Sequence, residues 1–236
     1  MICEKHGCYE PQKITILGHE LYTSCPLCEQ EEIAKEKTEQ ESYERKQKIE
    51  KLKKLGVEKE FVGKLLKDYI PENATEKEAY KAVVELKNGK IKKLILLGDY
   101  GTGKTHLANA LIQEHGNGIR ITMFELSCRI RRGYNFQKVE IDVLEDLLEQ
   151  YELFVIDELG RSPMSQAEMN WISYFVDKCH VRGKKIMLIS NRLQAKNLPP
   201  ERKAESFEMC LPNDAISRLC NNSKVIEIKG RDRRLS

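Results

Sequence analysis

The sequence predicts an α/β protein in which a parallel sheet of five strands follows a small cysteine-rich module and a charged helix. Apolar runs of strand length alternate with helical segments in the second half of the chain, which is typical of a parallel sheet covered by helices on both faces. A glycine-rich loop directly follows the first of these runs, and four of the eight cysteines fall within the first 28 residues. We therefore expect three parts, at residues 1–28, 29–55 and 56–236.

The composition is that of a soluble globular protein with a polar excess. Of the 236 residues, 40% are hydrophobic and 33% are charged, and the formal net charge is only +3. No apolar stretch is long enough to span a bilayer, and the chain opens without the apolar core of a signal peptide. We expect a cytoplasmic protein with no membrane partner.

The first 28 residues predict a zinc-binding module. Two residues separate Cys3 from His6 and Cys25 from Cys28, so each pair offers two ligands to a tetrahedral zinc ion. Such a small segment has too little apolar material to fold alone, so metal binding would stabilise it. Cys8 lies two residues after His6 and is an alternative fourth ligand. The other cysteines are scattered singly, and we expect them to be ordinary thiols: Cys128, Cys179, Cys210 and Cys220.

Residues 29–55 predict one long charged helix. Seven glutamates and two lysines occupy residues 29–44, whereas six basic residues and one glutamate occupy residues 45–54. This order suits the helix macrodipole, and several Glu–Lys pairs stand at the favourable i,i+4 spacing. We expect a solvated connecting helix that Gly56 ends, with docking on a partner as the alternative.

Residues 57–93 predict two helices before the sheet. Apolar residues between Phe61 and Tyr69 suggest a short amphipathic helix. A second helix starts from a capping box at residues 75–78 and stops at Asn88-Gly89.

Residues 98–105 read G-x-x-x-x-G-K-T and predict a nucleotide phosphate site. The motif lies between an apolar strand at 94–97 and a helix at 106–112, which is the context that the motif requires. Glycine lets the backbone N–H groups face the phosphates, the lysine brings a cation to the β- and γ-phosphates, and the threonine hydroxyl can ligate magnesium. The predicted nucleotide-binding residues are Gly98, Gly101, Thr102, Gly103, Lys104, Thr105 and His106.

Four further strands are predicted at residues 119–124, 151–158, 185–190 and 225–228. In such sheets the chemistry lies at the carboxyl ends of the strands. Asp157 is placed there to hold magnesium or its water, and Glu158 to orient and deprotonate an attacking water. Asn191 follows the next strand and is either a γ-phosphate sensor or an ordinary turn residue.

Two groups of arginines predict contacts with other molecules. Arg218, on a helix at 214–219, is either an arginine finger given to a neighbouring subunit or part of a surface salt bridge. The helix after the second strand combines cations with aromatic rings, which suits single-stranded DNA but also fits a solvated basic face. This cluster comprises Arg129, Arg131, Arg132, Tyr134 and Phe136.

Together these motifs resemble the AAA+ ATPases of the DnaC and IstB type over residues 56–236. The resemblance rests on G-T-G-K-T-H-L-A at 101–108, on Asp-Glu-Leu-Gly at 157–160, on Ser-Asn at 190–191 and on Ser-Arg-Leu at 217–219. It implies an AAA+ P-loop NTPase fold with a five-stranded parallel sheet, and ATP with Mg²⁺ as ligands. A terminal arginine of the family acts as a second sensor, and either Arg233 or Arg234 matches it.

The resemblance also implies a role for each motif residue. Lys104 and Thr105 match the Walker A positions, and the Walker B, sensor I and arginine-finger positions fall on Asp157, Glu158, Asn191 and Arg218.

The amino-terminal zinc segment and the charged linker resemble phage and prophage DnaC-like proteins. The implied function is ATP-controlled loading of a hexameric replicative DNA helicase onto single-stranded DNA, in a bacterial or phage-infected cell, by an oligomer with ATP between subunits. An IstB-type transposition helper, acting with a transposase on duplex DNA, is the alternative. A small-molecule phosphoryl-transferase is disfavoured because the motif residues form a hydrolytic set shared between subunits.

Overall fold

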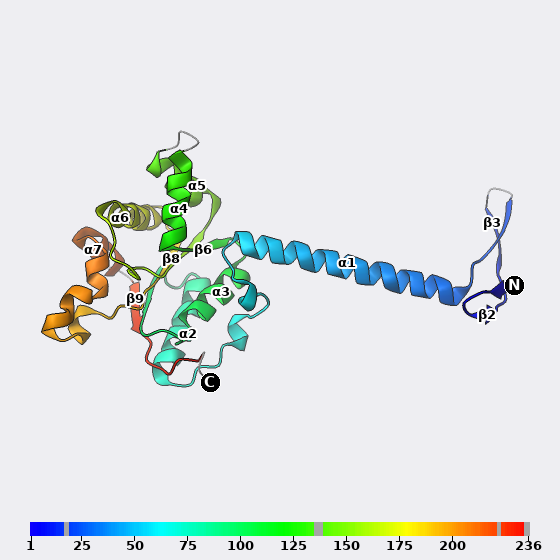
Figure 1. Cartoon of the computed structure of the whole chain (residues 1–236), viewed down its shortest axis with the longest axis horizontal. Helices are drawn as coiled ribbons and strands as arrows, with labels where there is room; N and C mark the ends of the chain where they lie inside the picture. The colour runs from blue at the N-terminus through cyan, green and yellow to red at the C-terminus, as the bar shows by residue number, and fades with distance from the viewer. Residues whose placement is uncertain (17–18, 135–138, 221–222, 234–236) are drawn as a thin grey trace. The chain divides into compact units, whose positions relative to one another are not determined.

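The computed structural model describes residues 1–16, 19–134, 139–220 and 223–233 (Figure 1). The chain forms two compact units, Met1–Lys51 and Leu52–Ser236. In the described ranges, no helix is both long and apolar enough to cross a membrane.

The first unit contains two small hairpins followed by a helix. β1 (Ile2–Cys3) pairs antiparallel with β2 (Gly7–Cys8), and β3 (Lys13–Ile16) pairs antiparallel with β4 (His19–Tyr22). Helix α1 (Pro26–Lys54) begins with proline, which suits the first helical position because its missing N–H would have no partner there. Residues 29–48 of α1 are exposed throughout.

The second unit is built on a five-stranded parallel sheet, which confirms the predicted fold class. Its strand order is β6-β7-β8-β5-β9, and all neighbours are parallel. All residues of β5 and β7 are buried, as expected for strands covered on both faces. The strands are β5 (Lys93–Leu97), β6 (Gly118–Thr122), β7 (Leu153–Asp157), β8 (Lys185–Ile189) and β9 (Ser223–Glu227).

Helices cover both faces of this sheet (Figure 1). Side chains alternate along each strand, so Ile95 and Phe154 pack into one core, and Leu94 and Leu96 pack into the other. The first core contains residues of α4 (Met123–Tyr134), α5 (Glu140–Gln150), α6 (Gln166–Val181) and α7 (Asn213–Cys220). The second contains residues of α2 (Ala74–Lys87) and α3 (Lys104–His115).

The predicted amphipathic helix between Phe61 and Tyr69 is wrong. Two short 3₁₀ turns occupy this segment, at Lys59–Phe61 and Leu66–Asp68. Gly63 has a positive φ of 83°, and its N–H donates to the side chain of Gln113 at 2.8 Å. Side chains of α3 therefore replace the intrahelical hydrogen bonds that a regular helix would need.

Two predicted element boundaries, the start of α2 and the end of the second strand, also need correction. Helix α2 is capped by Asn73 and not by Thr75, because the Asn73 side chain accepts the Glu76 N–H at 3.0 Å. The second predicted strand ends at Thr122 and not at residue 124. Thr122 and Glu125 form a reciprocal capping box, in which the Thr122 hydroxyl accepts the Glu125 N–H at 3.1 Å and the Glu125 carboxylate accepts the Thr122 N–H at 2.8 Å.

Candidate nucleotide and metal sites

The loop between β5 and α3 has the backbone shape of an anion cradle. Gly98, Gly101 and Gly103 all have positive φ, at 126°, 74° and 85°. Gly103 caps the N-terminus of α3, so the unpaired N–H groups of the first helical turn face the loop. This arrangement favours negative charge at the loop, as phosphate binding requires.

Lys104 places its ammonium at the centre of this loop. The side chain is 5% exposed, and its Nζ donates to the carbonyl oxygens of Gly98 at 2.7 Å and Asp99 at 2.6 Å. These bonds compensate for the burial of the charge and hold it among the backbone groups of the cradle.

Thr105 and Asp157 meet at the edge of the sheet, although they are 52 residues apart. The Thr105 hydroxyl lies 3.4 Å from Oδ2 of Asp157, and the aspartate is 2% exposed. A hydroxyl and a carboxylate are the hard oxygen ligands that Mg²⁺ prefers. The two side chains therefore fit a magnesium ion beside the phosphate loop.

Glu158 is the single non-glycine residue with positive φ, 58°, in the described part of the chain. Such a conformation costs about 1–3 kcal/mol and tends to occur at functional sites. The Glu158 N–H donates to Oδ1 of Asp157 at 2.7 Å, and the Glu158 carboxylate accepts a bond from Arg161 at 2.6 Å. The strained backbone thus links the two acidic residues at the end of β7.

A cavity of about 450 Å³ brings most of the predicted site residues together. Besides the phosphate loop, Asp157, Glu158 and Asn191 line it. Arg218 does not belong to this lining. Its side chain is 44% exposed and pairs with Asp177 at 3.0 Å.

The cavity lining also contains the rings of Phe61 and His106, of which only His106 was predicted to bind the nucleotide. The His106 ring lies 5.6 Å from the ring centroids of both Phe61 and Tyr69. Burial lowers the pKa of His106, so its imidazole is neutral at pH 7. The planes of the Phe61 and Tyr69 rings are inclined by 49° and 88° to that of His106, and aromatic rings beside a phosphate cradle suit contact with a nucleotide base. The apolar residues of this segment were visible in the sequence, but of Phe61, Leu65, Leu66 and Tyr69 the structure places only Phe61 in the cavity lining.

Arg233 reaches the same cavity from the C-terminal tail. Its guanidinium lies 4.8 Å from the Tyr69 ring centroid, it pairs with Glu76, and its backbone N–H donates to the Gly101 carbonyl at 3.1 Å. Arg233 therefore contacts the phosphate loop directly. The alternative second sensor, Arg234, lies outside the described residues.

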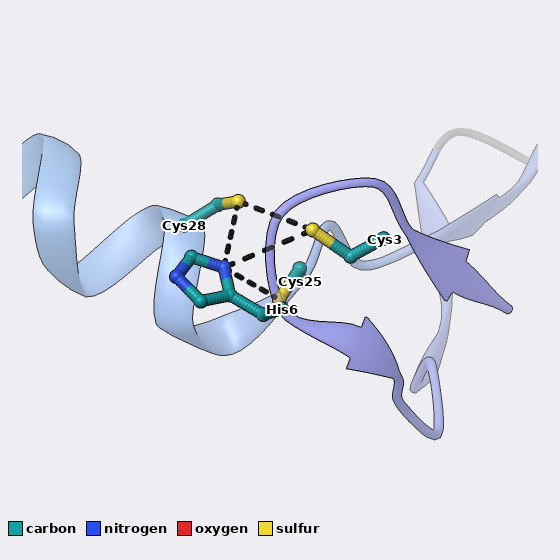
Figure 2. A group of neighbouring side chains, drawn as sticks. All are labelled: Cys3, His6, Cys25 and Cys28. Atoms are coloured by element: carbon teal, nitrogen blue, oxygen red, sulfur yellow. Dashed lines mark hydrogen bonds between the residues drawn. The ribbon is translucent and has the colours of Figure 1, made fainter.

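The first unit contains a compact cluster of Cys3, His6, Cys25 and Cys28 (Figure 2). The four ligand atoms lie within 4.8 Å of one another, and the Cys3 and Cys28 sulfurs are 3.5 Å apart. Tetrahedral zinc with Zn–S bonds of about 2.3 Å needs sulfurs about 3.8 Å apart, so the cluster could hold a metal ion. Cys8 is exposed and stands outside the cluster, so the structure groups His6, and not Cys8, with the other three residues.

Hydrogen bonds within this cluster shift the pKa values of Cys3 and Cys28 in opposite directions. Bonds from the backbone of His6 and then Lys5 lower the pKa of Cys3 to about 6, whereas the bond with Cys3 raises the pKa of Cys28 to about 11. Cys3 is thus a thiolate at neutral pH, the state in which cysteine ligates a metal. On its far side, Nε2 of His6 lies 3.1 Å from a Glu31 carboxylate oxygen, which orients the ring.

A second groove, of about 390 Å³, lies beside β6 and the start of α4. Of the predicted DNA-contacting residues, Arg129 and Arg132 line it, but Arg131 does not. The Tyr134 side chain and all of Phe136 lie outside the described part of the chain. The aromatic residue of the groove is instead Phe124, which is 73% exposed.

Comparisons with known proteins place this geometry in a family. The model of the IstB-like ATP binding protein family matches residues 26–236. A comparison with curated proteins returns no match.

Solved structures share the AAA+ fold of the second unit. A DnaC helicase loader aligns with a TM-score of 0.58 at 21% identity, over 73% of this chain and 100% of that one. A DnaI structure gives 0.56 at 20% identity, over 75% and 94%. Aquifex aeolicus DnaA bound to AMPPCP gives 0.57 at 19% identity, over 70% of this chain and 50% of that one, so this chain spans about half of that DnaA.

Proposed function

The chain belongs to the family of IstB-like ATP-binding proteins, which are AAA+ ATPases, and we propose that it uses ATP to load a replicative DNA helicase onto single-stranded DNA. The observation that supports this most is the cavity in which Lys104, Thr105, Asp157, Glu158 and Asn191 converge. A DnaC helicase loader shares this fold over its full length and 73% of this chain, which supports a loader-type role.

In this proposal each residue of the cavity has one task. Lys104 neutralises the β- and γ-phosphates, and Thr105 and Asp157 hold magnesium, which supplies further positive charge at the phosphates. Glu158 accepts a proton from the attacking water, and Asn191 orients that water and the γ-phosphate. Arg161 donates to Oε1 of Glu158, so the second oxygen of this carboxylate is the one that would accept the proton.

We expect Glu158→Gln to lower the ATP turnover by roughly 10²–10⁴-fold, because an amide cannot accept the proton of water. ATP affinity should stay within a few-fold of the wild type, since Lys104 and the loop backbone make the phosphate contacts. A steady-state ATPase assay and titration with a fluorescent ATP analogue measure the two quantities. Turnover close to that of the wild type would remove Glu158 from this role.

We assign Arg218 to the ATP site of a neighbouring subunit. It lies on α7, its side chain is 44% exposed, and its partner Asp177 is also at the surface, with 32% exposure. A surface ion pair of this kind contributes little to stability and can be exchanged easily. An arginine given across an interface would make hydrolysis depend on self-association.

Mixing two inactive variants tests action across an interface. Arg218→Ala subunits keep an intact nucleotide site, and Lys104→Ala subunits keep an intact Arg218, so random 1:1 oligomers should regain about one quarter of the active sites. Lys104→Ala mixed with Glu158→Gln is the matched control, because both changes lie in the same half-site and no rescue is expected. Absence of rescue in the first mixture would contradict action in trans.

We place single-stranded DNA in the groove beside β6. Besides the buried Arg120, four of the groove's side chains are cations that suit phosphates, and the exposed Phe124 ring suits stacking with a base. The cations are Lys53, Lys54, Arg129 and Arg132.

Replacing Arg129 and Arg132 by alanine should weaken single-stranded DNA binding and flatten its salt dependence by about 1.4 in log–log slope, at about 0.7 per lost phosphate contact. Arg131→Ala is the matched control, because Arg131 lies on the same helix outside the groove and should change the slope little. Fluorescence anisotropy at several salt concentrations measures this slope. An unchanged slope in the double variant would exclude the groove.

The IstB-type helper remains the second candidate because the family model carries that name. It predicts preferential binding to duplex DNA and to a transposase, whereas the loader predicts preference for single strands and for a hexameric helicase. The metal cluster favours the loader, because three of its four ligands precede the family match and the segment resembles the amino-terminal zinc segment of DnaC-like proteins.

We propose that the cluster binds zinc and that the module contacts the helicase. Cys28→Ser should reduce zinc from about one ion per chain to near zero by elemental analysis, since three ligands seldom suffice for a structural site, and should abolish capture of the helicase. Cys8→Ser is the control, because Cys8 is exposed and outside the cluster, and both properties should persist. Zinc loss in the Cys8 variant would overturn the ligand set, and helicase capture by the zinc-free Cys28 variant would overturn the contact.

A further inference from the structure

Arg120 is a buried cation that contacts Asp157, the aspartate that we propose as a magnesium ligand. It lies in the middle of β6 and is 6% exposed. Its Nε and Nη2 atoms donate to Oδ2 of Asp157 at 3.0 and 2.8 Å. Two bonds from one planar guanidinium to one oxygen fix the orientation of that carboxylate, which faces the Thr105 hydroxyl.

The same guanidinium also binds the segment that follows α1. Its Nη2 lies 2.6 Å from a Glu58 carboxylate oxygen, and its Nη1 donates to the Gly56 carbonyl at 3.3 Å. The Arg120 backbone N–H donates to the Leu55 carbonyl at 2.9 Å. Residues 55–58, which we call the junction segment, are therefore attached to Arg120 through both its backbone and its side chain.

Gly56 allows this close approach. Its φ is +81°, and a Cβ built there would lie 1.7 Å from the Arg120 carbonyl oxygen. Any side chain at this position would push the junction segment away from β6.

The junction segment is also connected, through Asn109, to Thr105, the second proposed magnesium ligand. The Glu58 N–H donates to Oδ1 of the buried Asn109 at 3.0 Å, and Asn109 Nδ2 donates to the Thr105 carbonyl at 2.8 Å. Hydrogen bonds thus run from one short segment to both Thr105 and Asp157.

We propose that Arg120 is a positioning residue that aims Asp157 at magnesium and ties the magnesium site to the junction segment. A buried ion pair contributes little net stability by itself, because desolvation offsets the attraction between its charges. Its geometric effect is larger, since groups that orient a metal ligand commonly change metal affinity by about 10–100-fold. A displacement of the junction segment, which joins α1 to the ATPase unit, then changes the magnesium affinity of the ATP site.

The test compares nucleotide binding in EDTA with binding at graded Mg²⁺, using a fluorescent ATP analogue. In EDTA, the nucleotide affinity of Arg120→Gln should stay within about twofold of the wild type. The Mg²⁺ concentration that gives half of the maximal effect on nucleotide binding should rise at least about tenfold, as expected for loss of a group that orients a metal ligand. Arg120→Lys should restore part of the shift, and Glu58→Gln should raise the concentration about two- to threefold through the junction segment alone. Arg182→Gln, which removes an ion pair to Glu145 far along the chain, is the control and should change nothing.

Each other outcome overturns a stated part of the proposal. If Arg120→Gln loses nucleotide affinity equally in EDTA and in Mg²⁺, the role of Arg120 is purely structural. If the variant needs less Mg²⁺ than the wild type, Arg120 competes with the metal for Asp157. If Glu58→Gln leaves the required Mg²⁺ concentration unchanged, the junction segment does not influence the magnesium site. Glu58 is 41% exposed, so its variant keeps the test available if Arg120→Gln does not fold. The readout needs neither DNA nor helicase, so it stands or fails independently of the loader role.

Discussion

The parallel pairing of β5, β7 and β8 is the constraint on which the site depends. Parallel strands present all their carboxyl ends at one edge, so the phosphate loop after β5, the acidic pair at the end of β7 and Asn191 after β8 share a single cavity. β5 and β7 are buried throughout because helices cover both of their faces. The strand order β7-β8-β5 therefore brings together, in one cavity, site residues from segments that are far apart in the chain.

Burial of charge at this edge determines which residues must cooperate. Lys104, Asp157 and Arg120 are each at most 6% exposed, and buried charges persist only when bonded. Lys104 is held by loop carbonyls, whereas Asp157 is held by Arg120, the Glu158 N–H and Thr105. A change in any of these bonding partners therefore alters the position of the Asp157 carboxylate. The junction segment can cause such a change because it bonds Arg120.

The first unit follows a different physical rule. Its hairpins are too small to bury a core, so a metal ion held by the Cys–His cluster would take the place of apolar packing. Helix α1 has an exposed surface over residues 29–48 and joins this module to the junction segment. The junction segment itself lies within the second unit, where it bonds Arg120.

Local patterns in the sequence determined the phosphate loop, the acidic strand end, the metal-ligand spacing and the five strands, because each depends on neighbours within a few residues. Tertiary structure alone decided the rest. Phe61 lies in a 3₁₀ turn because α3 side chains bond its neighbours, Arg233 rather than another residue of the described tail enters the cavity, and Arg120 meets Asp157 because β6 pairs with β7. These contacts join residues 37 or more positions apart, and no local periodicity or spacing encodes them.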